Sequence, residues 1–189
     1  MDNKKVDFSK QAGEDAKKHG VGGAGYFEMA EGDNKVRVLS EGIVLASHFL
    51  GKKEKPAICF GKDEGCPYHG AKDPSNPQAG EWDKPNLKWL MYVIDRKDGA
   101  VKQAKMPWTV FKRLGELQMM EDWAFDGVPM PYDLTISAIG AGTKEVEYAI
   151  TPSPKREPIT AEQMDELAKK MPIDQVVDRI KEKAKNSDE

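Results

Sequence analysis

Cysteine is scarce in this chain, with only two residues among 189, and histidine occurs three times. Two cysteines are too few for the disulfide framework of a small secreted domain, and thiols of cytosolic proteins stay reduced. No apolar run approaches the about 20 residues that span a bilayer. Residues 1–20 also lack the apolar centre of a signal peptide. We therefore expect a cytoplasmic protein with reduced thiols and no membrane partner.

Catalytic motifs are missing as well. The chain contains neither HExxH nor HxE followed by PCxxC, which are patterns of catalytic zinc sites. It also shows no glycine-rich phosphate loop and no spaced set of a nucleophile and its base. The sequence therefore does not predict an enzyme.

The chain has no large excess of charge of either sign, since its net charge is −3. The charges are nevertheless segregated. Residues 35–113 contain fifteen basic and nine acidic side chains, whereas residues 114–189 contain nine basic and sixteen acidic ones. This pattern predicts a positive surface in the middle of the chain and an acidic C-terminal part. Chance variation along a charged chain is the alternative explanation.

Composition and periodicity divide the first half of the chain into three stretches. Residues 1–26 are polar and glycine-rich toward their end, which predicts a flexible N-terminal arm. From residue 34 to residue 50, apolar and polar residues alternate as in two strands joined by a turn. Residues 51–86 are dense in glycine, proline, aspartate and lysine. Irregular loops of that length inside a compact domain are usually functional.

The second half begins with the clearest hairpin, "LKWLMYVIDRKDGAVKQAKMPW", in which Asp-Gly supplies the turn. "WTVFKRLGELQMM" has its apolar residues at helical spacing, and "YDLTISAIG" with "EVEYAITPS" predicts another hairpin. This order predicts a mainly β fold with α: a five-stranded OB-type barrel over residues 27–155 with an inserted zinc-binding loop. Another small α+β sheet is the alternative.

Residues 156–189 follow a proline-rich hinge and predict a C-terminal helical appendage. Thr160 and Gln163 form a capping box at the start of the first helix. Two apolar stripes follow, one of Met164, Leu167, Ala168 and Met171 and one of Ile173, Val176, Val177 and Ile180. They predict either packing on the barrel or docking to a protein partner.

Four of the five cysteine and histidine residues lie between His48 and His69. Cys66 and His69 have the two-residue gap of a zinc knuckle, and His48 with Cys59 would complete a closed tetrahedral set for one structural zinc ion. The zinc would fold a subdomain, at about residues 48–85, that has too little apolar content to fold itself. The alternative is two ordinary buried cysteines with surface histidines.

Five motifs follow one another along the chain: "EGDNKVRVLSE", the His48–Cys59–Cys66–His69 loop, "KWLMYVIDRKDG", "MPWTVFKRLGEL" and "YDLTISAIG…VEYAITPSP". Over roughly residues 27–155 the chain resembles the single-stranded DNA-binding (helix-destabilising) proteins of tailed bacteriophages. The resemblance implies an OB fold with a zinc subdomain near its first strands, no enzymatic activity, and a role in DNA replication, recombination and repair. It implies that the C-terminal segment recruits a polymerase, helicase or primase. His69 stands where the family commonly has a third cysteine.

Proteins hold single strands with cations that follow the phosphates and with rings that stack on bases. Trp89 and Tyr92 stand three apart on one predicted strand and face opposite sides, so one of them is core and the other exposed. The resemblance favours Trp89 for the DNA groove, and we expect Trp108 and Phe111 in the core. The predicted DNA-binding residues are Lys35, Arg37, Trp89, Tyr92, Arg96, Lys102 and Lys105.

Two hypotheses about function follow. The first is a sequence-non-specific single-stranded DNA-binding protein that protects and straightens DNA. The second is a zinc-stabilised adaptor that holds proteins and binds no nucleic acid. The segregated charges and the cations on the predicted strands favour the first hypothesis.

Overall fold

The computed structural model describes residues 25–48, 56–69, 85–143 and 145–186. The predicted N-terminal arm, residues 1–26, therefore lies outside the described residues except for its last two. Much of the predicted zinc subdomain also lies outside them, although all four predicted metal ligands lie within them.

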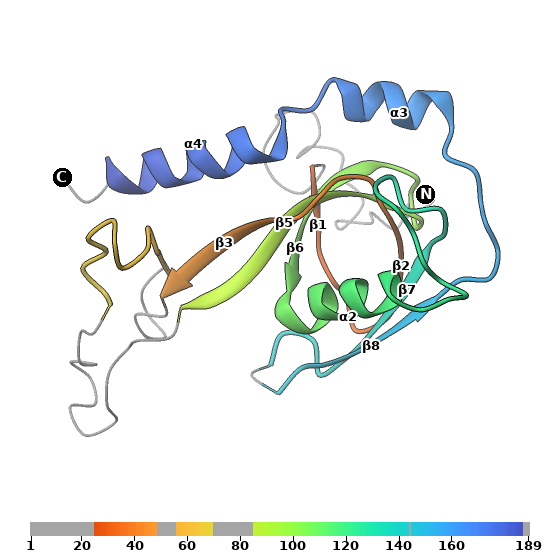
Figure 1. Cartoon of the computed structure of the whole chain (residues 1–189), viewed down its shortest axis with the longest axis horizontal. Coiled ribbons are helices and arrows are strands. Elements are labelled where there is room, and N and C mark those ends of the chain that lie inside the picture. Colours follow the sequence, from red (N-terminus) through yellow and green to blue (C-terminus); the bar gives the residue numbers. More distant parts are fainter. Residues whose placement is uncertain (1–24, 49–55, 70–84, 144, 187–189) are drawn as a thin grey trace, which may run out of the picture.

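Strands dominate the described residues, and three helices accompany them (Figure 1). The strands are β1 (Tyr26–Phe27), β2 (Gly32–Val38), β3 (Ile43–His48), β4 (Ala57–Ile58), β5 (Asn86–Asp95), β6 (Val101–Pro107), β7 (Leu134–Ile139) and β8 (Glu147–Pro152). The helices are α2 (Trp108–Gln118), α3 (Ala161–Ala168) and α4 (Ile173–Lys185). The two predicted hairpins are confirmed as β5–β6 and β7–β8, and the helix predicted between them is α2.

One long strand, β5, organises the sheet. Its first edge pairs with β6, and its second edge pairs with β3 over residues 86–90 and then with β2 over residues 93–95. The remaining order runs β1-β6-β5-β2-β7-β8, with β4 on the outer edge of β3. Because β2 and β3 share one edge of β5, they diverge from each other, and the sheet curls around α2 (Figure 1).

The mainly β fold with helices is therefore confirmed, whereas a five-stranded OB-type barrel is not. The sheet of the described residues has eight strands and is open. The strands beyond five are β3, β4 and β1. Strand β3 pairs with the outer part of β5 and β4 pairs with β3, so that together they hold two of the predicted metal ligands. Strand β1 adds a short parallel pair to β6.

The two faces of the sheet carry separate apolar clusters, because successive side chains of a strand point to opposite sides. On β5, Met91 and Val93 belong to the first cluster, which α2 covers with Val110, Leu114 and Leu117. The second cluster takes the alternate residues of β5 and is covered by α4. Its buried members are Leu39, Leu45, Leu90, Tyr92, Ile94, Val101, Ile173 and Val177.

The C-terminal segment folds back onto the second face. Thr160 and Gln163 form the predicted capping box of α3, and Ile173 and Val177 of α4 are buried against the sheet. Figure 1 shows α4 running over β3 and β5, and both strands contact it. Val176 and Ile180 are partly buried against the same cluster, so the whole second apolar stripe packs on the sheet, together with Leu167 of the first stripe. Recruitment of a partner by residues 156–189 stays a prediction.

Candidate metal centre and aromatic surface

Two of the predicted metal ligands are brought together by the pairing of β3 with β4. His48 is the last residue of β3 and lies opposite Ala57 of β4. The backbone N–H of Cys59, one residue beyond β4, donates to the carbonyl of Ala46 at 2.9 Å. The ladder thereby holds both side chains at one end of the strand pair.

Tight turns deliver the other two ligands. Gly61 and Gly65 adopt positive φ angles of 106° and 74°, a conformation that glycine adopts without steric cost. The N–H of Cys66 donates to the carbonyl of Gly61 at 3.2 Å, and the N–H of His69 donates to the carbonyl of Cys66 at 3.3 Å. The Cys66–His69 turn therefore points both side chains back toward β3, as the spacing predicted.

The four ligand atoms form a compact set. One ring nitrogen of His48, one of His69 and the Sγ atoms of Cys59 and Cys66 all lie within 4.8 Å of one another. Sγ of Cys59 is 3.0 Å from Nε2 of His69, and Sγ of Cys66 is 3.5 Å from Nε2 of His48. Tetrahedral zinc with sulfur and nitrogen ligands separates its ligand atoms by about 3.3–3.8 Å. The cluster can therefore hold a metal ion with little movement.

The electrostatics of the centre also favour a cation. Burial raises the pKa of the Cys59 thiol, and the neighbouring Cys66 side chain raises it further, whereas a backbone hydrogen bond at Gly61 and, more weakly, the charge of Lys181 lower it. A bound metal ion reverses this effect because it stabilises thiolates directly. His48, Cys59 and Cys66 are buried and His69 is half-buried. Four protein ligands leave no open position, so the centre suits a structural ion and not a catalytic one.

Helix α4 contacts the metal loop from outside. The Lys185 ammonium lies 5.0 Å from the centre of the Phe60 ring and 3.9 Å from a carboxylate oxygen of Glu64. Ile58, in the strand before Cys59, packs against the second apolar cluster. The loop is therefore joined to the body of the protein by α4 as well as by β3.

Three of the predicted DNA-binding cations surround a buried carboxylate instead of lining an open track. Asp133 is completely buried, and Nε of Arg37 donates to it at 2.6 Å while Nη2 of Arg96 donates at 3.0 Å. Nζ of Lys35 lies 3.6 Å from Asp133 and donates to Glu157 at 2.8 Å. Arg37 itself is only 3% exposed. Each of these cations compensates a carboxylate, and removal of that carboxylate would leave a charge unpaired inside the protein.

This network shifts ionisation and fixes the C-terminal segment. The hydrogen bond to Glu157 raises the pKa of Lys35, and the same bond holds the pKa of Glu157 below its ordinary value. Nη2 of Arg37 also donates to the backbone carbonyl of Glu157 at 2.7 Å. The chain that leads to α3 is therefore bound to β2 through two of the cations predicted to bind DNA.

Lys102 is neutralised in the same way. Its ammonium donates to Asp95 at 2.7 Å and to Asp98 at 2.6 Å. Burial alone would lower the pKa of Lys102, but the two hydrogen bonds outweigh it and raise the pKa. The groove around Lys35, Arg96 and Lys102 has a volume of about 860 Å³ and is lined by four basic and five acidic side chains. It is not a positive surface. Of the predicted cations only Lys105 is exposed.

The two aromatic candidates on β5 lie on opposite faces, as predicted. Tyr92 is buried in the second cluster, and its hydroxyl donates to the carbonyl of Met171 at 2.7 Å. Trp89 is half-buried on the first face. Its ring is stacked on Phe111, with 4.5 Å between ring centres and 8° between planes. It also lies 5.4 Å from the ring of Trp108.

The expectation that Trp108 belongs to the core is wrong, because its side chain is 54% exposed. The helical spacing indicates that Trp108 is exposed. Trp108 lies one turn before Lys112, on the polar face of α2, whereas Val110, Leu114 and Leu117 form the buried stripe. We call Trp108, Trp89 and Phe111 the aromatic row. It is a surface feature that sequence reasoning recognised only in part.

Searches of family models, curated proteins and solved structures found no match to this chain. Among the described residues, no helix is both long and apolar enough to cross a membrane.

Proposed function

We propose that this protein is a non-enzymatic, sequence-non-specific single-stranded DNA-binding protein stabilised by one structural zinc ion. Its role would be to protect and straighten single strands during replication, recombination and repair. The observation that carries the proposal is the aromatic row, in which stacked rings end in an exposed tryptophan on the first face of the sheet. Such rings bind bases of any sequence, because every base has a π face.

Cations beside the aromatic row support binding of phosphates. Lys112 lies one helical turn beyond Trp108 and its side chain is 61% exposed, with Glu116 at 3.7 Å as a weakly held partner. Exposed ion pairs of this kind contribute little to stability, so a phosphate can replace the carboxylate. In this proposal Lys112 contacts the phosphates, in place of the cations that surround Asp133.

The metal centre supports zinc as the structural ion. Two imidazole nitrogens and two thiol sulfurs, all within 4.8 Å of one another, form the ligand set that zinc takes in structural sites. The ion would be held by His48, Cys59, Cys66 and His69, and would fix the loop against β3 and α4.

The topology supports an ancestry in the OB fold. Without β1, β3 and β4, the strand order is β6-β5-β2-β7-β8, and α2 comes between β6 and β7 in the chain. This is the helix position of a five-stranded OB-type barrel. In this protein α2 contacts both β6 and β8 and so bridges the two edges that a closed barrel would join.

A titration of labelled oligo-dT with the purified protein, at low and at moderate salt, tests the proposal. We expect saturable binding that weakens as salt rises, because counterions are released from the phosphates. Lys112→Ala should weaken binding and reduce the salt dependence, whereas Lys97→Ala, an exposed lysine at the tip of the β5–β6 hairpin, should leave both unchanged. Absence of binding at low salt would refute the proposal.

A zinc-stabilised protein adaptor is the second candidate. A largely apolar groove beside Trp108 is also lined by Leu87, Val146 and Tyr148, and Leu87 is 38% exposed. Apolar surface of this kind also suits a protein segment. Binding of oligo-dT that does not depend on Trp108 or Lys112 would favour the adaptor for this surface.

A further inference from the structure

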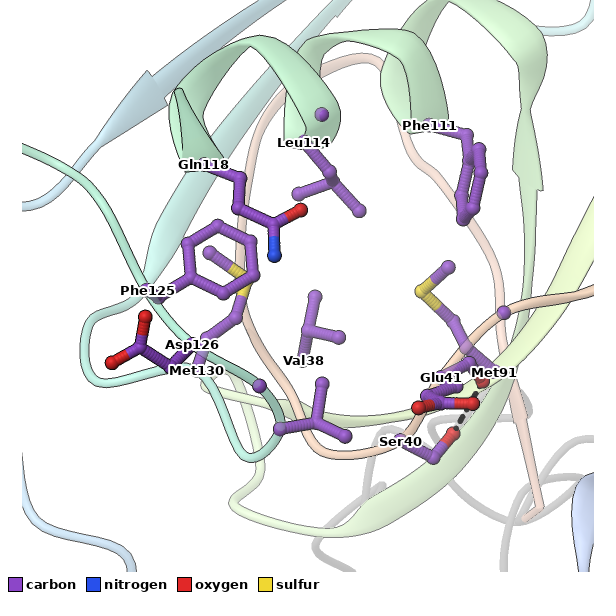
Figure 2. Close-up of a pocket in the computed structure, with 14 residues that line it drawn as sticks. Val38, Ser40, Glu41, Met91, Phe111, Leu114, Gln118, Phe125, Asp126 and Met130 are labelled. Carbon is purple, nitrogen blue, oxygen red and sulfur yellow. Dashed lines mark hydrogen bonds between the residues drawn. The ribbon is translucent and has the colours of Figure 1, made fainter. Parts of the chain in front are cut away.

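A cavity of about 430 Å³ lies next to the aromatic row, between α2, the β2–β3 connection and the chain before Met130 (Figure 2). Its floor is apolar and consists of Val38, Met91, Leu114 and Met130, all of them buried. Figure 2 shows Phe111 and Phe125 on opposite sides of the space. Its volume is within the range of pockets that bind small molecules.

The rim of the cavity is polar and lacks basic side chains. Glu41, Gln118 and Asp126 line it, and the amide of Gln118 points into the space in Figure 2. None of these three side chains forms a hydrogen bond or an ion pair with another of the described residues. A ligand that offers N–H donors would therefore meet available acceptors here, while a phosphate would be repelled.

The absence of a side chain at Gly42 allows Phe111 and Met91 to line the cavity close to the backbone. A Cβ atom on Gly42 would lie 2.7 Å from Cε2 of Phe111 and 3.0 Å from Cε of Met91. Because Gly42 has no such atom, the Phe111 ring packs over the backbone and contacts Trp89 on one side while lining the cavity on the other. The cavity is thus continuous with the aromatic row through a single ring.

We propose that this cavity receives one base of the bound strand and prefers a base that carries an exocyclic amino group. The inference rests on the proposed function, and it adds one base-sensitive position to a binding surface that otherwise reads no sequence. The floor and the two phenyl rings bind the faces of the base. The Glu41 carboxylate then accepts a hydrogen bond from the amino group, as carboxylates do from N4 of cytosine.

The discrimination follows from the chemistry of the rim. Uracil and thymine place a carbonyl oxygen where cytosine has its amino group, and a carboxylate repels that oxygen. The Gln118 amide can turn to suit either base, so the preference comes from Glu41, with Asp126 adding negative charge. A base is favoured over a lysine or arginine of a partner protein because Phe111 is shared with the aromatic row, which already places stacked bases beside the opening.

The experiment compares short oligo-dT strands that differ only at one central position, which is either deoxycytidine or deoxyuridine. Cytosine has an amino group at C4 and no proton on N3, whereas uracil has a carbonyl at C4 and a proton on N3. The two bases are otherwise the same. We expect the deoxycytidine strand to bind about five-fold more tightly, the gain from one partly exposed hydrogen bond. Glu41→Gln should abolish this preference, because an amide can face either base. Glu121→Gln removes the same charge from an exposed residue that does not line the cavity, and should retain the preference.

The methyl groups of Met91 and Met130 report the occupant directly, since both residues line the cavity. In spectra of protein with labelled methionine methyl groups, the deoxycytidine strand should shift both signals, and Glu41→Gln should reduce the shifts. Equal affinity for the two strands, or a preference that survives Glu41→Gln, would overturn the inference while leaving strand binding intact. Shifts caused by an arginine-rich peptide and not by the strand would also overturn it. Failure of all strands to bind would instead refute the proposed function.

Discussion

The two faces of β5 differ in how completely they are covered, although both belong to the same strand. On the second face, Leu90, Tyr92 and Ile94 are buried beneath α4, and the Tyr92 hydroxyl is hydrogen-bonded to the backbone before that helix. On the first face, α2 covers Met91 and Val93 but leaves Trp89 half-exposed beside Trp108 and a cavity. One face is closed by the chain itself, and the other stays partly open.

The difference separates stability from binding. A closed face gains free energy from apolar burial and satisfied polar groups, so changes there should act on unfolding. An exposed stacked ring adds little to stability and is available to a ligand. Four predictions test this separation, in order of decreasing effect.

Removal of a predicted metal ligand should lower the stability most of the four changes. It should also destabilise α4, the helix that covers the closed face. Cys66→Ser should release the metal ion and lose several kcal/mol of the about 10–16 kcal/mol that structural zinc supplies to small zinc domains. Elemental analysis and thermal unfolding would measure this. Because Phe60 and Glu64 contact Lys185, hydrogen exchange at the end of α4 should also accelerate.

The control for this change is His19→Ala, which removes the one histidine outside the predicted ligand set. It should retain one zinc ion per chain and the unfolding temperature of the parent. A Cys66→Ser protein that kept its zinc and its resistance to proteolysis at residues 56–69 would contradict the assignment of the centre.

Asp133→Ala should have the next largest effect. It leaves Arg37 buried without its carboxylate and should lower the free energy of unfolding by about 3–5 kcal/mol. Denaturant unfolding measures the loss, and Asp122→Ala is the control because Asp122 is exposed. If Asp133→Ala left stability unchanged but abolished strand binding, the network would belong to the binding surface after all.

Trp108→Ala should act on the open face alone. We expect binding of oligo-dT to weaken by about 1–3 kcal/mol, the contribution of one stacked base, with stability changed by less than about 0.5 kcal/mol. Met119→Ala, at the residue that follows α2 and has a side chain that is 87% exposed, should change neither quantity. A marked fall in thermal stability with unchanged binding would show that Trp108 serves packing.

Tyr92→Phe should show the reverse behaviour and the smallest effect. It removes only the hydrogen bond to the Met171 carbonyl and should lower the free energy of unfolding by about 0.5–1.5 kcal/mol. Binding of oligo-dT should stay the same. Tyr26→Phe, at a tyrosine that is 51% exposed, is the matched control. Weaker DNA binding by Tyr92→Phe would contradict the assignment of Tyr92 to the closed face.

Local patterns were sufficient for much of the fold. The Asp-Gly turn between β5 and β6, the apolar stripe of α2 and the Thr160–Gln163 capping box all depend on residues a few positions apart, and all were predicted. The four residues of the candidate metal centre were also predicted from composition, because cysteine and histidine are rare in this chain and gather in one polar segment. The pairing of β3 with both β4 and β5 was not predicted, because nothing local specifies which strand edge a segment joins.

The charged residues show the limit of sequence reasoning most clearly. Lys35 and Arg37 alternate with valines along β2, so both side chains lie on one face of the strand, where both reach Asp133. It could not show that Asp133 and Glu157, about a hundred residues later, would occupy the same place. Acids from the C-terminal part therefore compensate Lys35, Arg37 and Arg96, while Lys102 is held by the nearby Asp95 and Asp98. No positive groove results there, because acidic side chains line it alongside the basic ones.

The sequence by itself determined the two hairpins, the helices and the side chains of the candidate metal centre, because helical and strand periodicity and ligand spacing are local properties. Only the tertiary structure decided which face of β5 is closed. That outcome depends on α4 returning to the sheet, and Arg37 and Tyr92 hold the returning chain through hydrogen bonds to the Glu157 and Met171 carbonyls. Whether a side chain belongs to the core or contacts a ligand depends on the segment that covers it. Local sequence cannot show this, because the covering segment lies far along the chain.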